Sequence, residues 1–182
     1  MTLTPLEDWG HEKRRHPAAY EDTPTYRLAA GWLDGRHTIE DWGCGTAWAR
    51  QFYTLGQYRG LDGTGSRFCD EVVDLRTYRS EVACITMRHV LEHNWDWRLI
   101  AQNFAASWTH RAALALFIPP QPDDFDAGGP EWPIPDVAVG GADLIESLDP
   151  RGEVIFESWQ QWEFPHDHPM QWGWEGLLLM SR

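Results

Sequence analysis

One segment of the chain, residues 111–119 (RAALALFIP), is almost continuously apolar. A run of this kind, without polar alternation, is typical of a strand that is buried on both faces, as in a parallel sheet covered by helices. Other short apolar runs precede and follow it, and helical patterns separate several of them. This alternation predicts an α/β fold, a three-layer sandwich built on a mostly parallel sheet.

The expected elements can be placed along the chain from these patterns. Strands are predicted at residues 37–42, 57–63, around 72–73, and at 82–87, 111–119, 153–159 and 175–182. Helices are predicted at residues 25–34, 46–55, 88–108 with a break near Asn94, and 143–148. The last two strands are expected to add an antiparallel hairpin at the edge of the sheet.

The length of 182 residues suits a single domain. We divide it into an N-terminal arm (1–24), a core (25–118), a lid or insert (119–152) and the C-terminal strands (153–182). The lid is expected to begin with a long loop, because residues 119–141 hold six of the twelve prolines together with several glycines and aspartates.

The composition limits the partners that the chain is expected to have. Its formal net charge is -13, whereas proteins that bind nucleic acid usually carry a basic patch. The best basic segment, HEKRRH at residues 11–16, is short, so we expect a small molecule or a protein rather than free nucleic acid. The three cysteines form no CxxC pair and no signal peptide precedes them, which favours a cytoplasmic protein with reduced thiols. No apolar run approaches the roughly 20 residues of a membrane helix.

Two glycines, Gly43 and Gly45, stand where the strand at residues 37–42 should give way to a helix. Glycines at such a turn let a ligand approach the backbone closely. A dinucleotide-binding turn needs a third glycine where this chain has Trp48, and a P-loop needs a Gly-Lys-Ser/Thr sequence that does not follow here. The turn therefore predicts a ligand other than a diphosphate.

Several polar motifs are expected at the same edge of the sheet, because ligands in open α/β sheets bind at the carboxyl ends of the strands. These motifs are Asp41–Ala47, Asp62, Asp74 and Arg88–His89. Their convergence is the main sequence evidence for a binding site.

In these motifs the sequence resembles the Rossmann-like (class I) S-adenosylmethionine-dependent methyltransferases. The segment DWGCGTA, residues 41–47, is similar to their acid-x-Gly-x-Gly-x-Gly turn, with Ala47 in place of the last glycine. Asp62 matches the acidic residue that closes their second strand, and Asp74 with Leu75 matches the acid-apolar pair that borders the adenine. The resemblance covers the core well and the C-terminal strands loosely.

This resemblance implies S-adenosylmethionine as the cofactor and gives several residues a role. Gly43 and Gly45 would let the backbone approach the methionine part, and Asp41 would orient its amino group. Asp62 would accept hydrogen bonds from both ribose hydroxyls, and Asp74 would accept one from the adenine amino group. The implied cofactor-binding residues are Asp41, Trp42, Gly43, Cys44, Gly45, Asp62, Gly63, Asp74, Leu75 and Arg88.

The segment HVLEH places His89, Glu92 and His93 at i, i+3 and i+4, on one face of a helix if the segment is helical. An inverted zinc-protease motif has this pattern, but it needs a third ligand on a long helical domain, and the motif here follows a predicted strand. We favour a structural role, in which these side chains fix the turn and the start of the helix. A catalytic base and a metal site completed from residues 166–168 stay open.

Methyl transfer from a sulfonium is an in-line displacement, so the enzyme chiefly positions the acceptor and excludes water. A general base is needed only when the acceptor is protonated. The candidates are His89, His166 and His168, because the pKa of imidazole lies near neutrality.

Tryptophans of the lid and of the C-terminal segment are candidates for flat walls of an acceptor pocket, with packing in the core as the alternative. They are Trp132, Trp159, Trp162, Trp172 and Trp174. The predicted function is an S-adenosylmethionine-dependent methyltransferase with a small-molecule acceptor. The alternatives are a non-catalytic partner-binding protein of the same fold, a nucleic-acid methyltransferase and an aminopropyl transferase.

Overall fold

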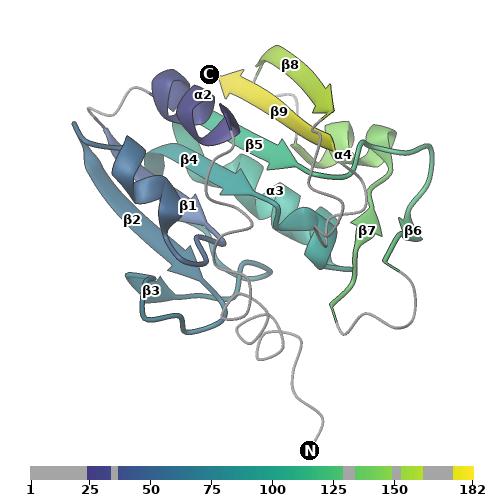
Figure 1. Cartoon of the computed structure of the whole chain (residues 1–182), viewed down its shortest axis with the longest axis horizontal. Coiled ribbons are helices and arrows are strands. Elements are labelled where there is room, and N and C mark those ends of the chain that lie inside the picture. The colour runs from purple at the N-terminus through teal and green to yellow at the C-terminus, as the bar shows by residue number, and fades with distance from the viewer. Residues whose placement is uncertain (1–23, 34–36, 129–133, 149–152, 162–173) are drawn as a thin grey trace, which may run out of the picture.

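The computed structural model describes residues 24–33, 37–128, 134–148, 153–161 and 174–182. The strands of its main sheet are β1 (Thr38–Trp42), β2 (Gln57–Asp62), β3 (Glu71–Val72), β4 (Val82–Arg88), β5 (Trp108–Leu116), β8 (Glu153–Gln161) and β9 (Trp174–Ser181). They form a seven-stranded sheet in the order β3-β2-β1-β4-β5-β9-β8, with β3 and β8 at opposite edges (Figure 1).

The direction of the strands confirms the predicted α/β architecture. Strands β1 to β5 pair in parallel, and β9 runs antiparallel to both β5 and β8. Residues 111–116 of the apolar run 111–119, which predicts a doubly buried strand, lie in β5, between β4 and β9, and the last three residues follow it. Each residue of β5 from Ala112 to Leu116 is at most 4% exposed.

Helices cover the two faces of the sheet. On one face, α2 (Pro24–Leu33) and the 3-10 helix η2 (Trp48–Phe52) pack on a cluster that includes Leu33, Ile39 and Ala113. On the other face, α3 (Trp97–Ser107) and α4 (Gly141–Leu148) enclose a larger cluster that includes Trp42 and Phe104. Residues 112–116 of β5 and 177–180 of β9 enter the two clusters alternately, as the two-residue period of a strand requires.

The segment after the glycine turn is shorter than predicted. Instead of a helix over residues 46–55, the chain forms η2, whose hydrogen bonds from Arg50 N to Ala47 O and from Tyr53 N to Arg50 O each span three residues. Ala47 precedes η2 with a left-handed φ of 54°, which an alanine rarely adopts. That conformation prevents an α-helix from beginning directly at the turn.

The predicted break near Asn94 is confirmed. The 3-10 helix η3 (Leu91–His93) ends there, and α3 starts at Trp97. Asn94 is extended, and its side-chain amide donates to the carbonyl of Val90 at 2.6 Å. This bond closes η3 and lets the chain turn into α3 in a new direction.

The described part of the lid carries two short strands that the sequence patterns do not predict, β6 (Phe125–Asp126) and β7 (Val137–Ala138). They pair antiparallel, at the end of the molecule toward which β4 and β5 point (Figure 1). Asp124 joins this region to α3, since its carboxylate accepts from the Gly140 backbone at 2.6 Å and from the Trp97 indole at 3.1 Å. Among the described residues, no helix is long and apolar enough to cross a membrane.

Candidate functional site

The strand register brings the predicted motifs to one level of the sheet. Trp42 pairs with Leu61 on one side and with Met87 on the other. The residues that follow these three positions are Gly43, Asp62 and Arg88, so all three lie at the carboxyl edge. The interleaving of β1 between β2 and β4 therefore assembles this edge from separate parts of the sequence.

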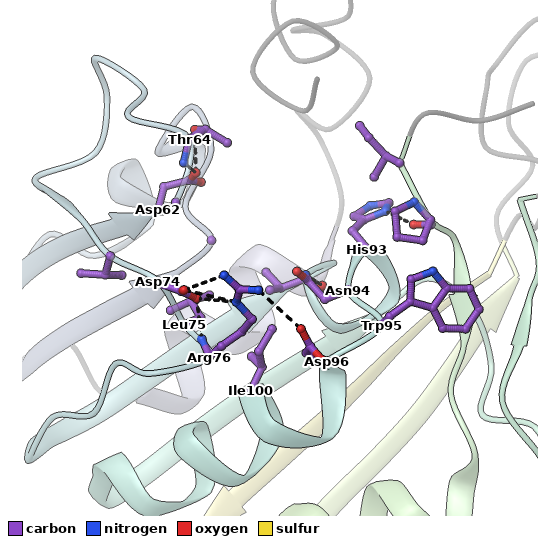
Figure 2. A pocket seen from close by; sticks show the side chains of 16 residues that line it. Asp62, Thr64, Asp74, Leu75, Arg76, His93, Asn94, Trp95, Asp96 and Ile100 are labelled. Atoms are coloured by element: carbon purple, nitrogen blue, oxygen red, sulfur yellow. Dashed lines mark hydrogen bonds and ion pairs between the residues drawn. The ribbon is translucent and has the colours of Figure 1, made fainter. Parts of the chain in front are cut away.

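A cavity of about 470 Å³ opens at this edge (Figure 2). Its walls come from the segments after β1, β2, β3 and β4, from α3 and from the lid. The lining residues are Gly43, Asp62, Gly63, Thr64, Val73, Asp74, Leu75, Arg76, Val90, His93, Asn94, Trp95, Asp96, Ile100, Ile134 and Pro135. Five of the ten residues implied as cofactor-binding are among them: Gly43, Asp62, Gly63, Asp74 and Leu75.

The glycine turn lies tightly against the chain that follows β4. Gly43 has φ +73°, and a Cβ atom added there would lie 2.3 Å from Cγ2 of Val90. The amides of Gly43 and Cys44 both donate to the carbonyl of Leu61, at 2.8 and 3.0 Å. No side chain fits at position 43, which is why the backbone itself forms this wall of the cavity.

Asp62 fastens the turn to the end of β2. The side chain is only 2% exposed, and its Oδ2 accepts from the backbone amide of Gly45 at 2.7 Å. Its Oδ1 accepts from the amide and the hydroxyl of Thr64, at 2.8 and 2.6 Å. Asp62 thus holds the shape of the site as well as lining the cavity.

Asp74 and Arg76 form an ion pair on the opposite wall. Nε and Nη2 of Arg76 contact the carboxylate at 2.9 and 2.8 Å, and the Arg76 amide adds a third donor at 3.0 Å. The hydrogen bonds from Arg76 lower the pKa of Asp74 below its usual value. Nη1 of Arg76 also lies 3.6 Å from Asp96, at the start of α3. The sequence patterns do not single out Arg76 or Asp96.

Asp41 and Arg88 extend to the side of the sheet that α2 covers. Oδ2 of Asp41 accepts from the Tyr58 hydroxyl at 2.5 Å. Arg88 forms an ion pair with Glu175 of β9 at 2.7 Å, donates to the Tyr26 hydroxyl at 3.1 Å and lies over the Tyr26 ring. The structure therefore places these two residues in a buried polar layer beside the cavity rather than in its lining.

His89 belongs to the same buried layer. It adopts a φ of 55°, it is 5% exposed, and its Nε2 lies 2.8 Å from Oε1 of Glu175. Burial, together with the charge of Arg88, lowers the pKa of His89 to about 4. Burial opposes ionisation of Glu175, but Arg88 and His89 outweigh it and lower its pKa to about 2. His89 is therefore neutral at physiological pH and a weak base.

The other two residues of the HVLEH motif have separate partners. Oε1 of Glu92 accepts from the Phe117 amide at 2.5 Å, and burial raises the pKa of Glu92 to about 8. Nδ1 of His93 lies 3.1 Å from the Asp136 carboxylate and 3.2 Å from the Pro135 carbonyl. These contacts join η3 to the end of β5 and to the lid. Among the described residues, no group of three potential metal ligands gathers.

The other residues that the sequence predicts for the site are buried or lie outside the described residues. Trp42 lies fully buried, with its indole nitrogen donating to Glu40 at 3.0 Å, and Cys44 is also buried, with its sulfur facing Gly60. Trp95 is the tryptophan that lines the cavity, and it is 55% exposed. The predictions for His166, His168, Trp132, Trp162 and Trp172, and for the side chains of Trp159 and Trp174, lie outside the described residues.

Comparisons with known proteins bear on this arrangement through structure alone. No protein-family model matches the sequence, and no curated protein matches it. A methyltransferase structure from Burkholderia thailandensis, 1,6-didemethyltoxoflavin-N1-methyltransferase with its substrate and S-adenosylhomocysteine bound, is similar over 97% of this chain and 86% of its own, with a TM-score of 0.71 and 11% identity. The chain has the fold of the class I S-adenosylmethionine-dependent methyltransferases.

Two further structures show how widely this fold is used. A putative methyltransferase in complex with the Trm112 activator from Haloferax volcanii is similar over 100% of this chain and 97% of its own, with a TM-score of 0.66 and 15% identity. The [4+2]-cyclase SpnF is similar over 86% of this chain and 79% of its own, with a TM-score of 0.59 and 14% identity. Because one of these proteins is named as a cyclase, the fold by itself does not decide the reaction.

Proposed function

We propose that this protein is an S-adenosylmethionine-dependent methyltransferase with a small-molecule acceptor. The observation that carries the proposal is the cavity at the carboxyl edge of the sheet, where Gly43, Asp62 and Asp74 line one space. Its volume of about 470 Å³ lies within the range of roughly 300–1,000 Å³ that is usual for small-molecule sites. The fold, shared with structures that hold S-adenosylhomocysteine, adds support.

In this proposal the cofactor lies along the cavity from the glycine turn to the wall formed after β3. The methionine part approaches the backbone at Gly43, and the ribose lies beside Asp62. The adenine lies between the segment after β3 and α3, where Leu75 and Ile100 supply apolar surface. The acidic character of the chain suits a sulfonium cation.

We place the acceptor at the side of the cavity formed by His93, Trp95 and the lid residues Ile134 and Pro135. The neighbouring structures are named for small acceptors such as 1,6-didemethyltoxoflavin and magnesium protoporphyrin IX. Where the acceptor is a hydroxyl or amide, we assign its proton to His93 rather than to His89. The two described contacts of His93 Nδ1 are to oxygen acceptors, which favours the tautomer of the neutral ring with its proton on Nδ1.

Calorimetric titration with S-adenosylmethionine and S-adenosylhomocysteine, with NAD and ATP as controls, tests the proposal. We expect micromolar binding of the first two compounds alone, equivalent to about -8 kcal/mol, which would justify a screen of small acceptors. The absence of binding by both would overturn the proposal and favour a partner-binding protein of the same fold.

A further inference from the structure

Arg76 lies between two carboxylates that belong to different walls of the cavity. Figure 2 shows its guanidinium between Asp74, which follows β3, and Asp96, which precedes α3. Nε and Nη2 contact Asp74 at 2.9 and 2.8 Å, while Nη1 lies 3.6 Å from Asp96. The pairs fix the guanidinium although the Arg76 side chain is 51% exposed.

These contacts use the edges of the guanidinium. All of its N–H groups lie in the plane of the group, and the two carboxylates occupy opposite parts of that edge. A ligand in the cavity that Arg76 lines therefore meets the flat face of the group. The face of an arginine side chain stacks favourably on aromatic rings and nucleobases.

Asp74, in contrast, is already engaged by Arg76 through both of its oxygens. Its Oδ1 accepts from the Arg76 amide and from Nε, at 3.0 and 2.9 Å. Its Oδ2 accepts from Nη2 at 2.8 Å and, more weakly, from Nε at 3.2 Å. Three N–H groups of Arg76 make these four contacts, because the single Nε hydrogen is shared between the two oxygens, and they occupy most of the roughly four acceptor sites of the carboxylate. An adenine amino group would therefore compete with Arg76 for the Asp74 carboxylate.

We infer that the guanidinium face of Arg76 stacks on the purine base of the cofactor, and that Asp74 acts by holding Arg76 in place. Arg76 is a binding residue in this arrangement, and Asp74 is a positioning residue. The inference rests on the proposed function, because it requires the nucleoside part of the cofactor to enter this cavity. It replaces the direct contact between Asp74 and the adenine amino group that the sequence resemblance implies.

A double-mutant cycle with S-adenosylhomocysteine as the titrated ligand tests the inference. This ligand carries no sulfonium charge. Removing the charge of Arg76 or Asp74 therefore cannot change binding through attraction or repulsion of a sulfonium, and the measured effect reports mainly on contacts with the base. We expect Arg76→Ala and Asp74→Ala each to weaken binding about tenfold, equivalent to about 1.4 kcal/mol, and the double variant to be no weaker than either. Residues that act as one unit show this non-additivity.

Arg98→Ala is the matched control. Arg98 is 44% exposed and also pairs with two aspartates, Asp124 and Asp143, but it does not line the cavity. We expect this variant to bind S-adenosylhomocysteine as the parent does. Arg76→Lys keeps the charge and removes the flat face, and we expect it to bind as weakly as Arg76→Ala.

A base analogue separates the two roles of Asp74. In S-inosylhomocysteine an oxo group replaces the adenine amino group, and we expect the parent to bind it within a few-fold of S-adenosylhomocysteine. A hundredfold preference for the amino compound, additive losses in the cycle, or unchanged binding by Arg76→Ala would each overturn the inference while leaving the proposed function intact. Failure of the parent to bind either cofactor form would overturn the proposed function and the inference together.

Discussion

Two charged clusters at the carboxyl edge of the sheet differ in how deeply their side chains are buried. The buried cluster consists of Arg88, His89 and Glu175, whose side chains are 8%, 5% and 2% exposed. The cavity cluster consists of Asp74, Arg76 and Asp96, whose side chains are 42%, 51% and 61% exposed. Both contain an arginine held by a carboxylate, so the comparison isolates the effect of burial.

Burial gives the two clusters different functions. In the buried cluster the charges are removed from water and must satisfy one another, which changes the pKa of His89 and Glu175 strongly. In the cavity cluster the charges remain hydrated, so the pairs contribute little to stability but stay available to a ligand. The buried cluster therefore supports the sheet, and the cavity cluster is suited to binding.

The largest expected effect comes from breaking the buried cluster. Glu175→Ala removes the carboxylate that pairs with the buried charge of Arg88, and we expect it to lower the free energy of unfolding by about 3–5 kcal/mol. Urea denaturation followed by circular dichroism measures this loss. Asp143→Ala is the control, because it breaks an exposed arginine pair and should cost less than about 1 kcal/mol. Equal losses in the two variants would contradict the distinction between the clusters.

Asp62 combines the properties of the two clusters, since it is buried and also lines the cavity. We expect Asp62→Ala to abolish S-adenosylhomocysteine binding, weakening it at least about a hundredfold, or about 2.7 kcal/mol. The variant should also lose about 1–3 kcal/mol of stability, because the amides of Gly45 and Thr64 lose their acceptor.

Asp62→Asn separates these two consequences. The amide oxygen can still accept from Gly45 or from Thr64 but not from both, so we expect a smaller loss of stability than in Asp62→Ala. Binding measured by calorimetry should remain weak, because one acceptor oxygen becomes a donor group. Parent-like binding by Asp62→Ala would show that β2 does not contribute to the ligand site.

The energetic cost of the close approach between the glycine turn and the chain after β4 can be measured by substitution. Gly43 and Gly65 have similar φ values, +73° and +63°, but an added Cβ lies 2.3 Å from Val90 at Gly43 and 4.0 Å from Val72 at Gly65. We expect Gly65→Ala to cost about 1–2 kcal/mol from backbone strain alone, and Gly43→Ala to cost about 1–3 kcal/mol more from overpacking.

Thermal and urea unfolding of both variants measure the difference. Adding Val90→Ala to Gly43→Ala should remove part of the extra cost, because it deletes the methyl group that the new Cβ would meet. If Gly43→Ala were no worse than Gly65→Ala, the turn would not be held against the chain after β4.

The raised pKa of Glu92, which is fully buried, predicts that stability depends on pH. Its pKa is raised to about 8 in the folded state, so its stabilising effect is complete below its unfolded pKa of about 4.3 and is lost as the pH rises through 8. His89 has the opposite sign: its pKa is lowered to about 4, so stability rises with pH from 4 to about 6.5.

The two effects separate between pH 6.5 and 8, where, of these two groups, only Glu92 binds a different number of protons in the folded and unfolded states. We expect the free energy of unfolding to fall by about 2 kcal/mol across this window, and Glu92→Gln to abolish the fall because the amide does not ionise. Urea titrations at several pH values measure the slope. An unchanged slope in Glu92→Gln would assign the pH dependence to other groups.

The sequence predicts the scaffold better than the contacts between distant residues. Apolar runs and glycines are local signals, so the strands of the sheet and the positions of Asp62 and Asp74 follow from short segments. The ion pair between Arg88 and Glu175 joins residues 87 positions apart, and no local pattern shows that the sheet order brings β9 to the end of β4. The sequence therefore predicts that Arg88 lines the binding site, whereas in the structure its ion pair with Glu175 lies in the buried layer.

The contact between η3 and the lid is another that local sequence patterns do not predict, although its residues are closer in the sequence. His93 and Asp136 are in contact only because the chain returns past η3 after β5. The role of Arg76 depends on the relative position of Asp96 on another element, which spacing does not encode. The predicted helix at residues 46–55 is shortened to η2 by the left-handed Ala47, a conformation that the apolar pattern does not indicate.

The smallest expected effect on stability is also the sharpest test of the comparison. Arg76→Ala removes an exposed arginine from two surface ion pairs, so we expect the free energy of unfolding to change by about 0.2–1 kcal/mol. The same substitution should weaken S-adenosylhomocysteine binding about tenfold, as argued above. A large loss of stability would place Arg76 with the buried cluster as a structural residue. A small loss of stability with a clear loss of affinity would identify Arg76 as a ligand-binding residue. The exposed charges in the cavity would then contribute to ligand affinity and not to the free energy of unfolding.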